Sequence, residues 1–255
     1  MSRLPGAVAR HLAAFRAMIV FTVVCGIAYP LVMTGIGQLA FKNQADGSLI
    51  TNSKGQVLGS KLLCQTFVSP STADAALNKK DSTSSDSTGY ASPLNKYFQV
   101  RPTFSEDPTL GEYTIQLANG CDYAASGSNN LGPNSPNLVT LITVMRQDMA
   151  AFDSVPGYTV TAAQVATDAV TESGSDEEPY ITPQNADQQA ARIAQTRGIS
   201  VAEVDALIAA NTMGRDIGIL GEPAVNVTTL NIALDKQYAS SDTSVTSFDE
   251  ATASS

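Results

Sequence analysis

The sequence predicts an α+β protein in which a single N-terminal transmembrane helix precedes one extracytoplasmic domain of mixed α/β structure. Three observations indicate this. Residues 17–41 form an uncharged apolar run, and no later segment approaches its length. After this run, segments with helical periodicity and short strand-like segments both occur. When the apolar run and the terminal segments of the chain are left out, the 255-residue chain holds roughly one domain of globular material.

The apolar run is long enough to cross a membrane as a helix. At about 1.5 Å per residue, residues 17–41 would extend about 37 Å, against a hydrocarbon core of about 30 Å. Residues 1–16 contain three arginines and no acidic residue, which places them in the cytoplasm by the positive-inside rule. We therefore expect residues 42–238 to form a domain outside the cytoplasm.

A cleaved signal peptide is the alternative interpretation of the run. Gly26-Ile27-Ala28 offers a small-x-small cleavage site, but the apolar stretch continues well past it, through Pro30. Cys25 lacks the small residue expected just before a lipidated cysteine. A retained anchor is therefore favoured. Thr22 and Gly26 also form a small-xxx-small face, which indicates close packing on another helix.

The first elements after the anchor are predicted to be short strands. Asp46-Gly47 marks a turn into a strand at Leu49-Ile50, and a second break at Ser53-Lys54-Gly55 precedes Gln56–Ser60. This spacing predicts a hairpin. Residues 69–92 are rich in Ser, Thr, Asp and Ala, so we expect a flexible surface insertion.

Three helices are predicted in the second half of the chain. The first carries apolar residues on one face over 138–149. The second, Gln184–Arg197, has a proline at its start and a glycine past its end. The third follows Ser200, which forms a capping box with Glu203.

The C-terminal part is predicted to contain one more strand and a tail. Residues 224–234 resemble a strand in their first half, and residues 239–255 are expected to be a disordered tail. Asn226-Val227-Thr228 matches an N-glycosylation sequon. Because a strand is expected to run through it, we interpret this match as fortuitous.

The charge of the chain is strongly acidic outside its N-terminus. The formal net charge is −9, and removing the three arginines of residues 1–16 leaves 15 − 3 = 12 basic against 24 acidic residues, a net of −12. Such a charge argues against binding of nucleic acid or anionic lipid. It is compatible with attraction of cations, although a solvated surface explains it more simply.

The sequence lacks the usual signatures of an enzyme. It contains no phosphate-binding G-x-x-x-x-G-K-[ST] loop and no G-x-S-x-G elbow. The one histidine, His11, lies beside the cytoplasmic arginines, which excludes a Ser-His-Asp triad in the outer domain. Asp235-Lys236 is not followed by the Thr-Gly-Thr that a P-type pump requires. We therefore expect no catalysis and no metal centre in this chain.

Two loops and two cysteines leave alternatives open. The loop Ser126–Pro133 fits an anion-binding nest, a partner contact or a plain structural loop. Acidic residues at 172–178 fit acid–base work or cation binding, although a solvated loop is favoured. Cys64 and Cys121 would both lie outside the cytoplasm, where a disulfide is permitted, but nothing in the sequence brings them together.

An ordered series of motifs resembles the C subunit of the bacterial high-affinity potassium-transporting ATPase, the Kdp complex. The series covers about four-fifths of the chain and consists of Tyr29-Pro30-Leu31, Gln44–Ile50, Gly59-Ser60, Tyr97–Pro102, Ala125–Pro133, Ser173-Gly174-Ser175, Ile181-Thr182-Pro183, Gly221–Val227 and Leu230–Asp235. The family usually has Leu where Glu177 stands and often has Arg where Ala224 stands. Residues 69–92 and 156–164 resemble insertions, and the tail is extra.

The resemblance implies a function. In that family, a channel-like potassium-conducting subunit and a P-type ATP-hydrolysing subunit join a C subunit that serves assembly. The C subunit is described as a catalytic chaperone that raises the ATP affinity of the hydrolysing subunit. The resemblance thus implies a non-catalytic, single-pass subunit of the bacterial inner membrane, in contact with lipid. ATP and potassium would belong to the complex, with no cofactor assigned to this chain.

Residues for partner binding follow from these motifs. We expect helix packing through the Tyr29–Gly37 face and outer contacts from Arg101 and the loop at 126–132. The candidate interface residues are Gly26, Tyr29, Pro30, Arg101, Ser126, Gly127, Ser128, Asn129 and Gly132. The alternative is a free-standing membrane-anchored domain that binds a cation or an envelope component.

Overall fold

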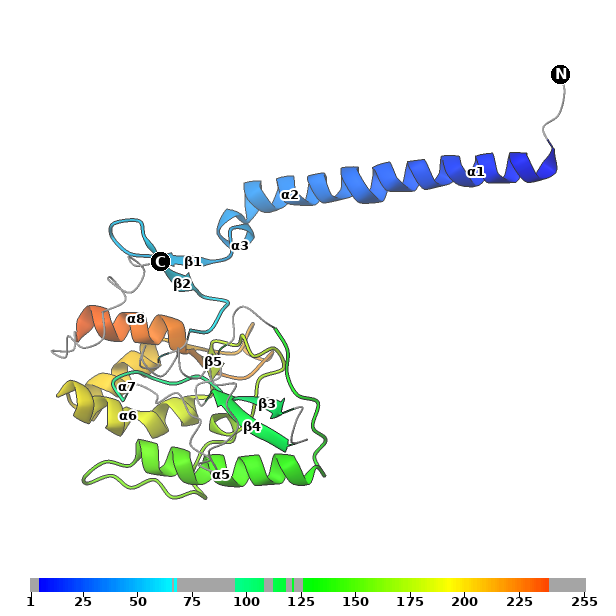
Figure 1. Cartoon of the computed structure of the whole chain (residues 1–255). Helices are drawn as coiled ribbons and strands as arrows, with labels where there is room; N and C mark the ends of the chain where they lie inside the picture. The colour runs from blue at the N-terminus through cyan, green and yellow to red at the C-terminus, as the bar shows by residue number, and fades with distance from the viewer. Residues whose placement is uncertain are drawn as a thin grey trace. The chain divides into compact units, whose positions relative to one another are not determined.

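The computed structural model describes residues 5–65, 67, 95–107, 112–117, 121 and 126–238 (Figure 1). The predicted insertion and the predicted C-terminal tail lie outside these residues. The chain divides into two compact units, residues 1–49 and 50–255, which are treated separately below.

The first unit contains the membrane helix. Helix α1 (Gly6–Phe21), a π-helical segment η1 (Thr22–Ala28) and helix α2 (Tyr29–Ala40) follow one another without a break. Together they form one 35-residue helix that contains an 18-residue stretch with a mean hydropathy of 2.1, so it is long and apolar enough to cross a membrane. The helix includes part of the predicted cytoplasmic flank, because it begins at Gly6. A short helix, α3 (Lys42–Ala45), follows.

Pro30 explains the π-helical segment. A proline has no N–H to donate to the carbonyl four residues earlier, and its ring collides with that carbonyl in a regular α-helix. Here the wider segment Thr22–Ala28 precedes the proline, and the N–H of Tyr29 reaches back to the carbonyl of Val24, five residues earlier. This widening accommodates the proline without interrupting the helix.

The predicted hairpin is confirmed. Strands β1 (Leu49–Thr51) and β2 (Val57–Ser60) pair in a two-stranded sheet. The side-chain Oδ1 of Asn52 accepts hydrogen bonds from the N–H groups of Lys54 and Gln56, and so closes the connecting turn.

The rest of the domain places helices beside two small sheets. Its helices and strands are β3 (Thr103–Asp107), β4 (Glu112–Leu117), α5 (Pro136–Asp153), the 3-10 turn η2 (Thr167–Ala169), β5 (Tyr180–Ile181), α6 (Pro183–Arg197), α7 (Val201–Ala210), β6 (Thr212–Met213), β7 (Ala224–Asn226) and α8 (Val227–Gln237). Strands β3 and β4 pair antiparallel, and β7 lies between β5 and β6, antiparallel to both. Figure 1 shows α6 between α5 and α7, with α8 on the other side of α7.

The three predicted helices are confirmed, and their ends follow the predicted signals. Helix α5 begins after Ser135, whose side chain accepts a hydrogen bond from the N–H of Leu138. Helix α6 ends at Gly198, which adopts φ 68°, a conformation that favours glycine. Both halves of the capping box between Ser200 and Glu203 form at the start of α7.

The C-terminal strand is shorter than predicted. Strand β7 ends at Asn226, and α8 begins at the next residue. Asn226 ends the strand because its side-chain oxygen accepts a hydrogen bond from the N–H of Thr229, as a helix N-cap. Its amide nitrogen donates to the carbonyl of Lys61, and the residue is 4% exposed. This burial agrees with the interpretation of the sequon as fortuitous.

Two groups of buried apolar residues form the core. The larger is built mainly on α6, α7, α8 and β7, and the smaller lies between α5 and residues 160–170. A disulfide between Cys64 and Cys121, which the sequence left open, joins the margin of the larger group. The remaining cysteine, Cys25, is a free thiol on the membrane helix.

A segment outside any strand, residues 95–100, contributes Tyr97, Phe98 and Val100 to the larger core, and side chains satisfy its backbone. Asn231 of α8 accepts from the N–H of Phe98 at 2.9 Å and donates to the carbonyl of the same residue at 2.9 Å. Gln189 of α6 does the same for Gln99, accepting at 2.8 Å and donating at 3.1 Å. These amide side chains replace the neighbouring strand that such a backbone otherwise requires.

Arg192 completes this arrangement, which we call the backbone clamp: the side chains of Gln189, Arg192 and Asn231 on the backbone of residues 95–99. The guanidinium of Arg192 donates to the carbonyl of Asn95 and, at 3.0 Å, to that of Tyr97. The clamp therefore fixes the segment between α6 and α8.

Removing one clamp residue is expected to destabilise the domain. In an Asn231→Ala variant, the buried N–H and carbonyl of Phe98 lose their partners, which costs about 2–4 kcal/mol of unfolding free energy. Alanine favours a helix, so the loss does not come from α8 itself. The change in unfolding free energy is measured by urea unfolding of the full chain in mild detergent, with circular dichroism as the signal. The exposed Lys236→Ala on the same helix should change stability by less than about 0.5 kcal/mol. Equal stability of the two variants would contradict a role for the clamp.

Candidate functional site

Three of the sequence motifs meet at one place in the domain. They are Tyr97–Pro102, Ala125–Pro133 and the loop that begins at Thr171, and we call residues 101, 126–132 and 171–177 together the motif junction. Arg101, half-buried, donates from Nε to the carbonyl of Thr171 at 3.1 Å and from Nη2 to its hydroxyl at 3.2 Å. The same Nη2 also donates to the carbonyl of Glu172.

The second motif is attached to the same loop. The side-chain amide of Asn129 donates to the carboxylate of Glu172 at 3.0 Å. The N–H of Gly127 donates to the carbonyl of Ser175 at 3.1 Å. Residues more than forty positions apart are thus held together by contacts that involve both side chain and backbone.

The Ser-Gly-Ser motif shapes the acidic loop. The hydroxyl of Ser173 accepts a hydrogen bond from the N–H of Asp176 at 2.7 Å, and Asp176 takes a left-handed φ of 59° in a buried position. The carbonyl of Glu177 then accepts from the N–H of the disulfide-bonded Cys64 at 2.9 Å. Because Glu177 makes this contact through its backbone, the loop is held whatever side chain stands there.

These contacts involve residues of both loops for which the sequence left alternatives open. One amide of the proposed anion nest, that of Gly127, is already donated inside the chain. The carboxylate of Glu172 accepts from Asn129, and Asp176 is 6% exposed. Across the described ranges, no group of three or more His, Cys, Asp or Glu side chains is placed to hold a metal ion. The contacts that the structure shows here are those of a structural junction.

The interface residues predicted for the outer domain differ in exposure. Ser126, Gly127, Ser128 and Gly132 are exposed and form the rim of the motif junction, whereas Asn129 is half-buried. Arg101 was predicted as a partner contact, but its guanidinium is engaged inside the domain. Partner binding by the rim stays a prediction.

The predicted membrane residues lie together in the helix. Gly26 is within the π-helical segment, and Tyr29 and Pro30 begin α2. All three residues are exposed in this chain, Tyr29 by 62%. A Cβ placed on Gly26 would come no nearer than 3.9 Å to another atom, that of Thr22. A larger residue at Gly26 therefore meets no obstacle within the chain itself.

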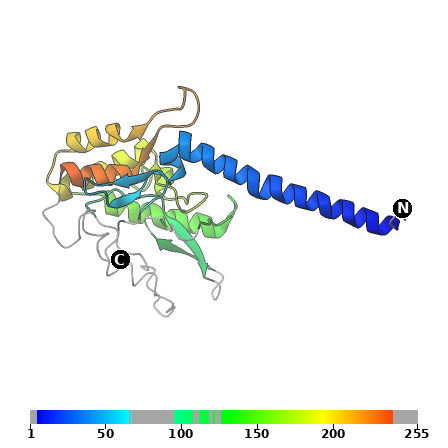
Figure 2. The same ribbon diagram turned by 90° about the horizontal axis from the view of Figure 1, so that it is seen from above.

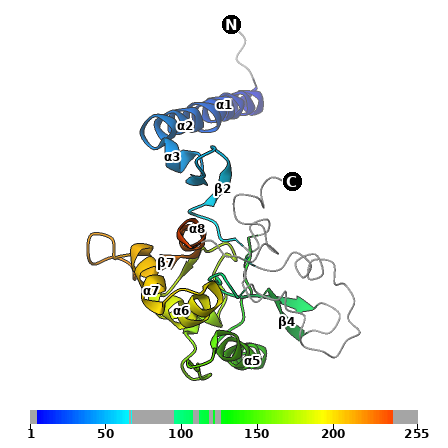
Figure 3. The same ribbon diagram turned by 90° about the vertical axis from the view of Figure 1, so that its left-hand side faces the viewer.

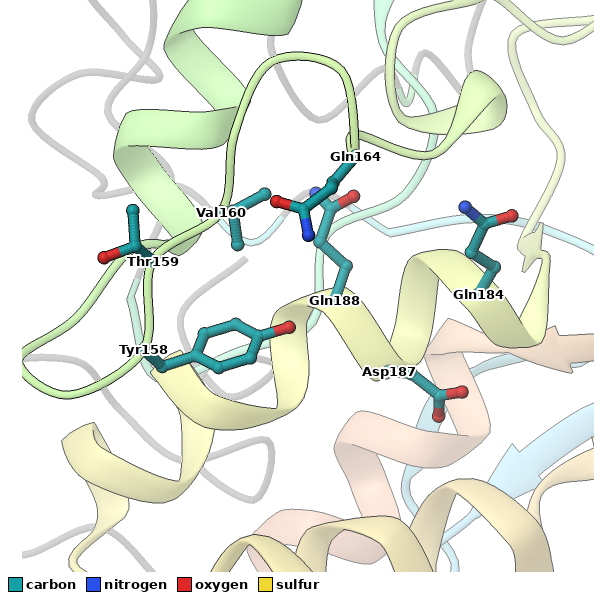
Figure 4. A pocket seen from close by; sticks show the side chains of 7 residues that line it. All are labelled: Tyr158, Thr159, Val160, Gln164, Gln184, Asp187 and Gln188. Atoms are coloured by element: carbon teal, nitrogen blue, oxygen red, sulfur yellow. The ribbon is translucent and has the colours of Figure 1, made fainter.

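A cavity of about 370 Å³ lies between residues 158–164 and helix α6 (Figure 4). Its polar groups are largely engaged: Gln188 donates to Asp153 and accepts from the N–H of Ala166, and Gln164 accepts from Thr161. The carboxylate of Asp187 points away from Tyr158, and partial burial together with repulsion from Asp205 raises its pKa. This cavity presents no nucleophile with a neighbouring base.

A buried ion pair joins α5 to the backbone clamp, and no pattern in the sequence predicted it. Arg192 and Asp153 lie 2.8 Å apart and are each 2% exposed. Burial lowers the pKa of the Arg192 guanidinium, and the Asp153 carboxylate opposes this by favouring the charged form. The sequence contains only a weak indication that Arg192 is buried. Gln189 and Arg192 stand one turn apart on a helix whose neighbouring apolar positions are buried.

A second polar group contacts the same segment at Tyr97. The hydroxyl of Tyr97 donates to the Asp235 carboxylate at 2.7 Å, and Arg197 pairs with Asp235 at 2.8 Å. Burial and the Asp235 charge raise the pKa of Tyr97, so its hydroxyl stays protonated at neutral pH. Asp235, which precedes Lys236, thus has two structural partners, Tyr97 and Arg197.

Comparison with known proteins gives a consistent result. A family model described as "KdpC: K+-transporting ATPase, c chain" matches residues 11–236. A potassium-transporting ATPase KdpC subunit of Mycobacterium bovis (strain BCG / Pasteur 1173P2) is 37% identical over 225 residues, 88% of this chain and 97% of that protein. The proteins of the same name from Caulobacter vibrioides (strain NA1000 / CB15N) and Gloeobacter violaceus are 38% and 35% identical over 87% of this chain, and the alignments cover 90% and 93% of those proteins.

The internal contacts of Arg101 predict a stability effect. Arg101→Met keeps the aliphatic stem but removes the charged donors to Thr171 and Glu172, which should cost about 1–3 kcal/mol of unfolding free energy. Urea unfolding of the full chain in detergent checks this. Lys61→Met, which removes an exposed cationic side chain, is the matched control and should be nearly neutral. If Arg101→Met is as stable as the control, the motif junction does not depend on this side chain.

Proposed function

The chain belongs to the KdpC family, the C chains of potassium-transporting ATPases, and from this premise we propose that it is a non-catalytic accessory subunit of an ATP-driven potassium import complex. One observation carries the proposal: the match extends over residues 11–236 and so includes the membrane helix and the domain together. The partners proposed are a channel-like potassium-conducting subunit and a P-type ATP-hydrolysing subunit. ATP hydrolysis is assigned to the latter.

The proposed topology has the N-terminus in the cytoplasm and the domain outside it. Three arginines precede the apolar part of the helix, in agreement with the positive-inside rule. The disulfide between Cys64 and Cys121 supports the same orientation, because such bonds persist in oxidising compartments.

The proposed mechanism is bracing of the transport subunits. The membrane helix offers one attachment, at the π-helical segment, and the rim of the motif junction offers a second. ATP lies in the cytoplasm, on the other side of the membrane from the proposed position of the domain. Any chaperone-like effect on ATP affinity would therefore act through the hydrolysing subunit's conformation, without ATP contacting this chain.

The topology predicts a labelling pattern in intact cells. Gln195→Cys, at an exposed position of α6, should react with a membrane-impermeant maleimide in whole cells. Ala9→Cys, at an exposed position near the N-terminus, should react only after permeabilisation. Mass shifts of the purified chain give both readouts. The reversed pattern would contradict the proposed orientation.

If the membrane helix packs against a partner subunit at Gly26, one substitution there should reduce copurification of the partner subunits. Gly26→Leu adds a side chain that this chain tolerates, so it should reduce recovery of the partner subunits several-fold only if another helix packs there. Ala28→Leu, two residues away and on a different side of the helix, is the control. Both are purified in mild detergent on a C-terminal tag, and the recovered proteins are quantified by mass spectrometry.

Two outcomes would contradict the proposed partner binding. Equal recovery of partners by Gly26→Leu and Ala28→Leu would remove Gly26 from the interface. Recovery of the unaltered chain alone, folded and monodisperse, would favour a free-standing membrane-anchored domain.

A further inference from the structure

The loop between β6 and β7, residues 214–223, exposes a cluster of aliphatic side chains. Ile217 is 83% exposed, Ile219 is 74% exposed and Leu220 is 58% exposed. We call these three residues the apolar tip. In Figure 2 and Figure 3 the loop extends beyond the helices next to it. Scattered exposed aliphatic residues are ordinary, but three within four positions on one projecting loop mark an interaction site.

The loop is held in one conformation by its own hydrogen bonds. Asp216 and Leu220 exchange two backbone hydrogen bonds, N–H to carbonyl at 2.8 Å and 3.0 Å. The N–H of Gly218 donates to the carbonyl of Arg215 at 3.1 Å. Arg215 also pairs with Glu222 at 2.8 Å, across the base of the loop. The apolar tip is thus presented by an ordered turn, which lowers the entropy lost when a partner binds.

Ile217 has a backbone conformation that its side chain disfavours. Its φ is +47°, and a β-branched residue rarely enters this left-handed region. Glycine would adopt it without strain, as Gly218 does next to it at φ +80°. The strained isoleucine makes no buried contact in return, because its side chain is almost fully exposed. Strain of this kind is typical of residues kept for function.

The chemistry of the loop favours a protein surface over a lipid surface. Residues 213–223 contain one arginine, one aspartate and one glutamate, and neither lysine nor any aromatic residue. Loops and helices that enter a bilayer interface are typically rich in lysine, arginine and tryptophan or other aromatics. Arg215 is already paired with Glu222, so the charge left around the apolar tip is that of Asp216.

We propose that the apolar tip docks into an apolar pocket with a basic margin on the outer surface of a partner subunit of the complex. This rests on the proposed function, which supplies such a partner. Ile217, Ile219 and Leu220 fill the pocket, and Asp216 faces its basic margin. Burial of exposed aliphatic side chains in an apolar pocket is favourable in proportion to the apolar area removed from water. The loop then forms an attachment separate from the membrane helix.

The first test measures binding of the full chain to partner subunits prepared without it. The triple variant Ile217→Ser, Ile219→Ser and Leu220→Ser should bind about 10- to 100-fold more weakly in detergent. Val139→Ser with Val201→Ser removes exposed aliphatic side chains elsewhere and should bind as the unaltered chain does. Thermal unfolding by circular dichroism should be unchanged in both. Equal binding by the triple variant and this control would overturn the docking proposal.

A single substitution separates docking from loop structure. Ile217→Gly relieves the left-handed strain, so the loop should be at least as stable, yet binding should still weaken because the side chain is lost. Unchanged binding by Ile217→Gly would remove this residue from the interface. If the unaltered chain itself fails to bind the partner subunits, the proposed function fails and the docking site fails with it.

A fluorescent probe distinguishes a protein pocket from lipid. Ile219→Cys, labelled with an environment-sensitive dye, should shift to shorter wavelength when the partner subunits are added. Reconstitution of the labelled chain alone into phosphatidylethanolamine–phosphatidylglycerol vesicles should leave the spectrum unchanged. A blue shift in vesicles without the partners would overturn the proposal in favour of membrane contact.

Discussion

The buried pair of Arg192 and Asp153 is the interaction on which the rest of the domain depends. A guanidinium at 2% exposure is stable only with a carboxylate and further acceptors around it, and the structure supplies both. The pair links α5 to α6, and the same arginine holds the backbone of residues 95–97. The two groups of buried apolar residues are thus connected through a polar contact. Removing either charge alone would leave the other buried and uncompensated.

The functional surfaces follow from this arrangement. The clamped segment leads directly to Arg101, which fixes the loop at 171–172, and that loop in turn receives Asn129. The loops that contain the sequence motifs therefore mostly make hydrogen bonds inside the domain. The rim at residues 126–128 is exposed. Polar side chains at these motifs thus hold the parts of the domain together.

Much of the local structure could be predicted because its signals are local. The apolar run, the capping box at Ser200 and the terminal glycine of α6 each act within one turn of a helix, so spacing alone reveals them. The end of β7 was harder to place. Val227–Leu230 has strand-like composition, and only the cap formed by Asn226 converts it to a helix.

The long-range contacts could not be predicted, for a physical reason. Cys64 and Cys121 are 57 residues apart, so no local pattern in the sequence brings them together. The buried amides that hold residues 98 and 99 lie 90 to 133 positions away and look like ordinary surface residues in the sequence. The same limit applies to the internal hydrogen bonds of Arg101, whose acceptors lie in a loop 70 residues later. The apolar tip also escaped notice, because exposure is not visible in composition.

Photolabelling of the purified complex with an azido analogue of ATP shows which subunits contact the nucleotide. If this chain supports the pump without contacting ATP, the P-type subunit is labelled, excess ATP abolishes that label, and this chain carries none. Label on this chain that excess ATP abolishes would contradict the proposal and assign the chain a direct part in nucleotide binding.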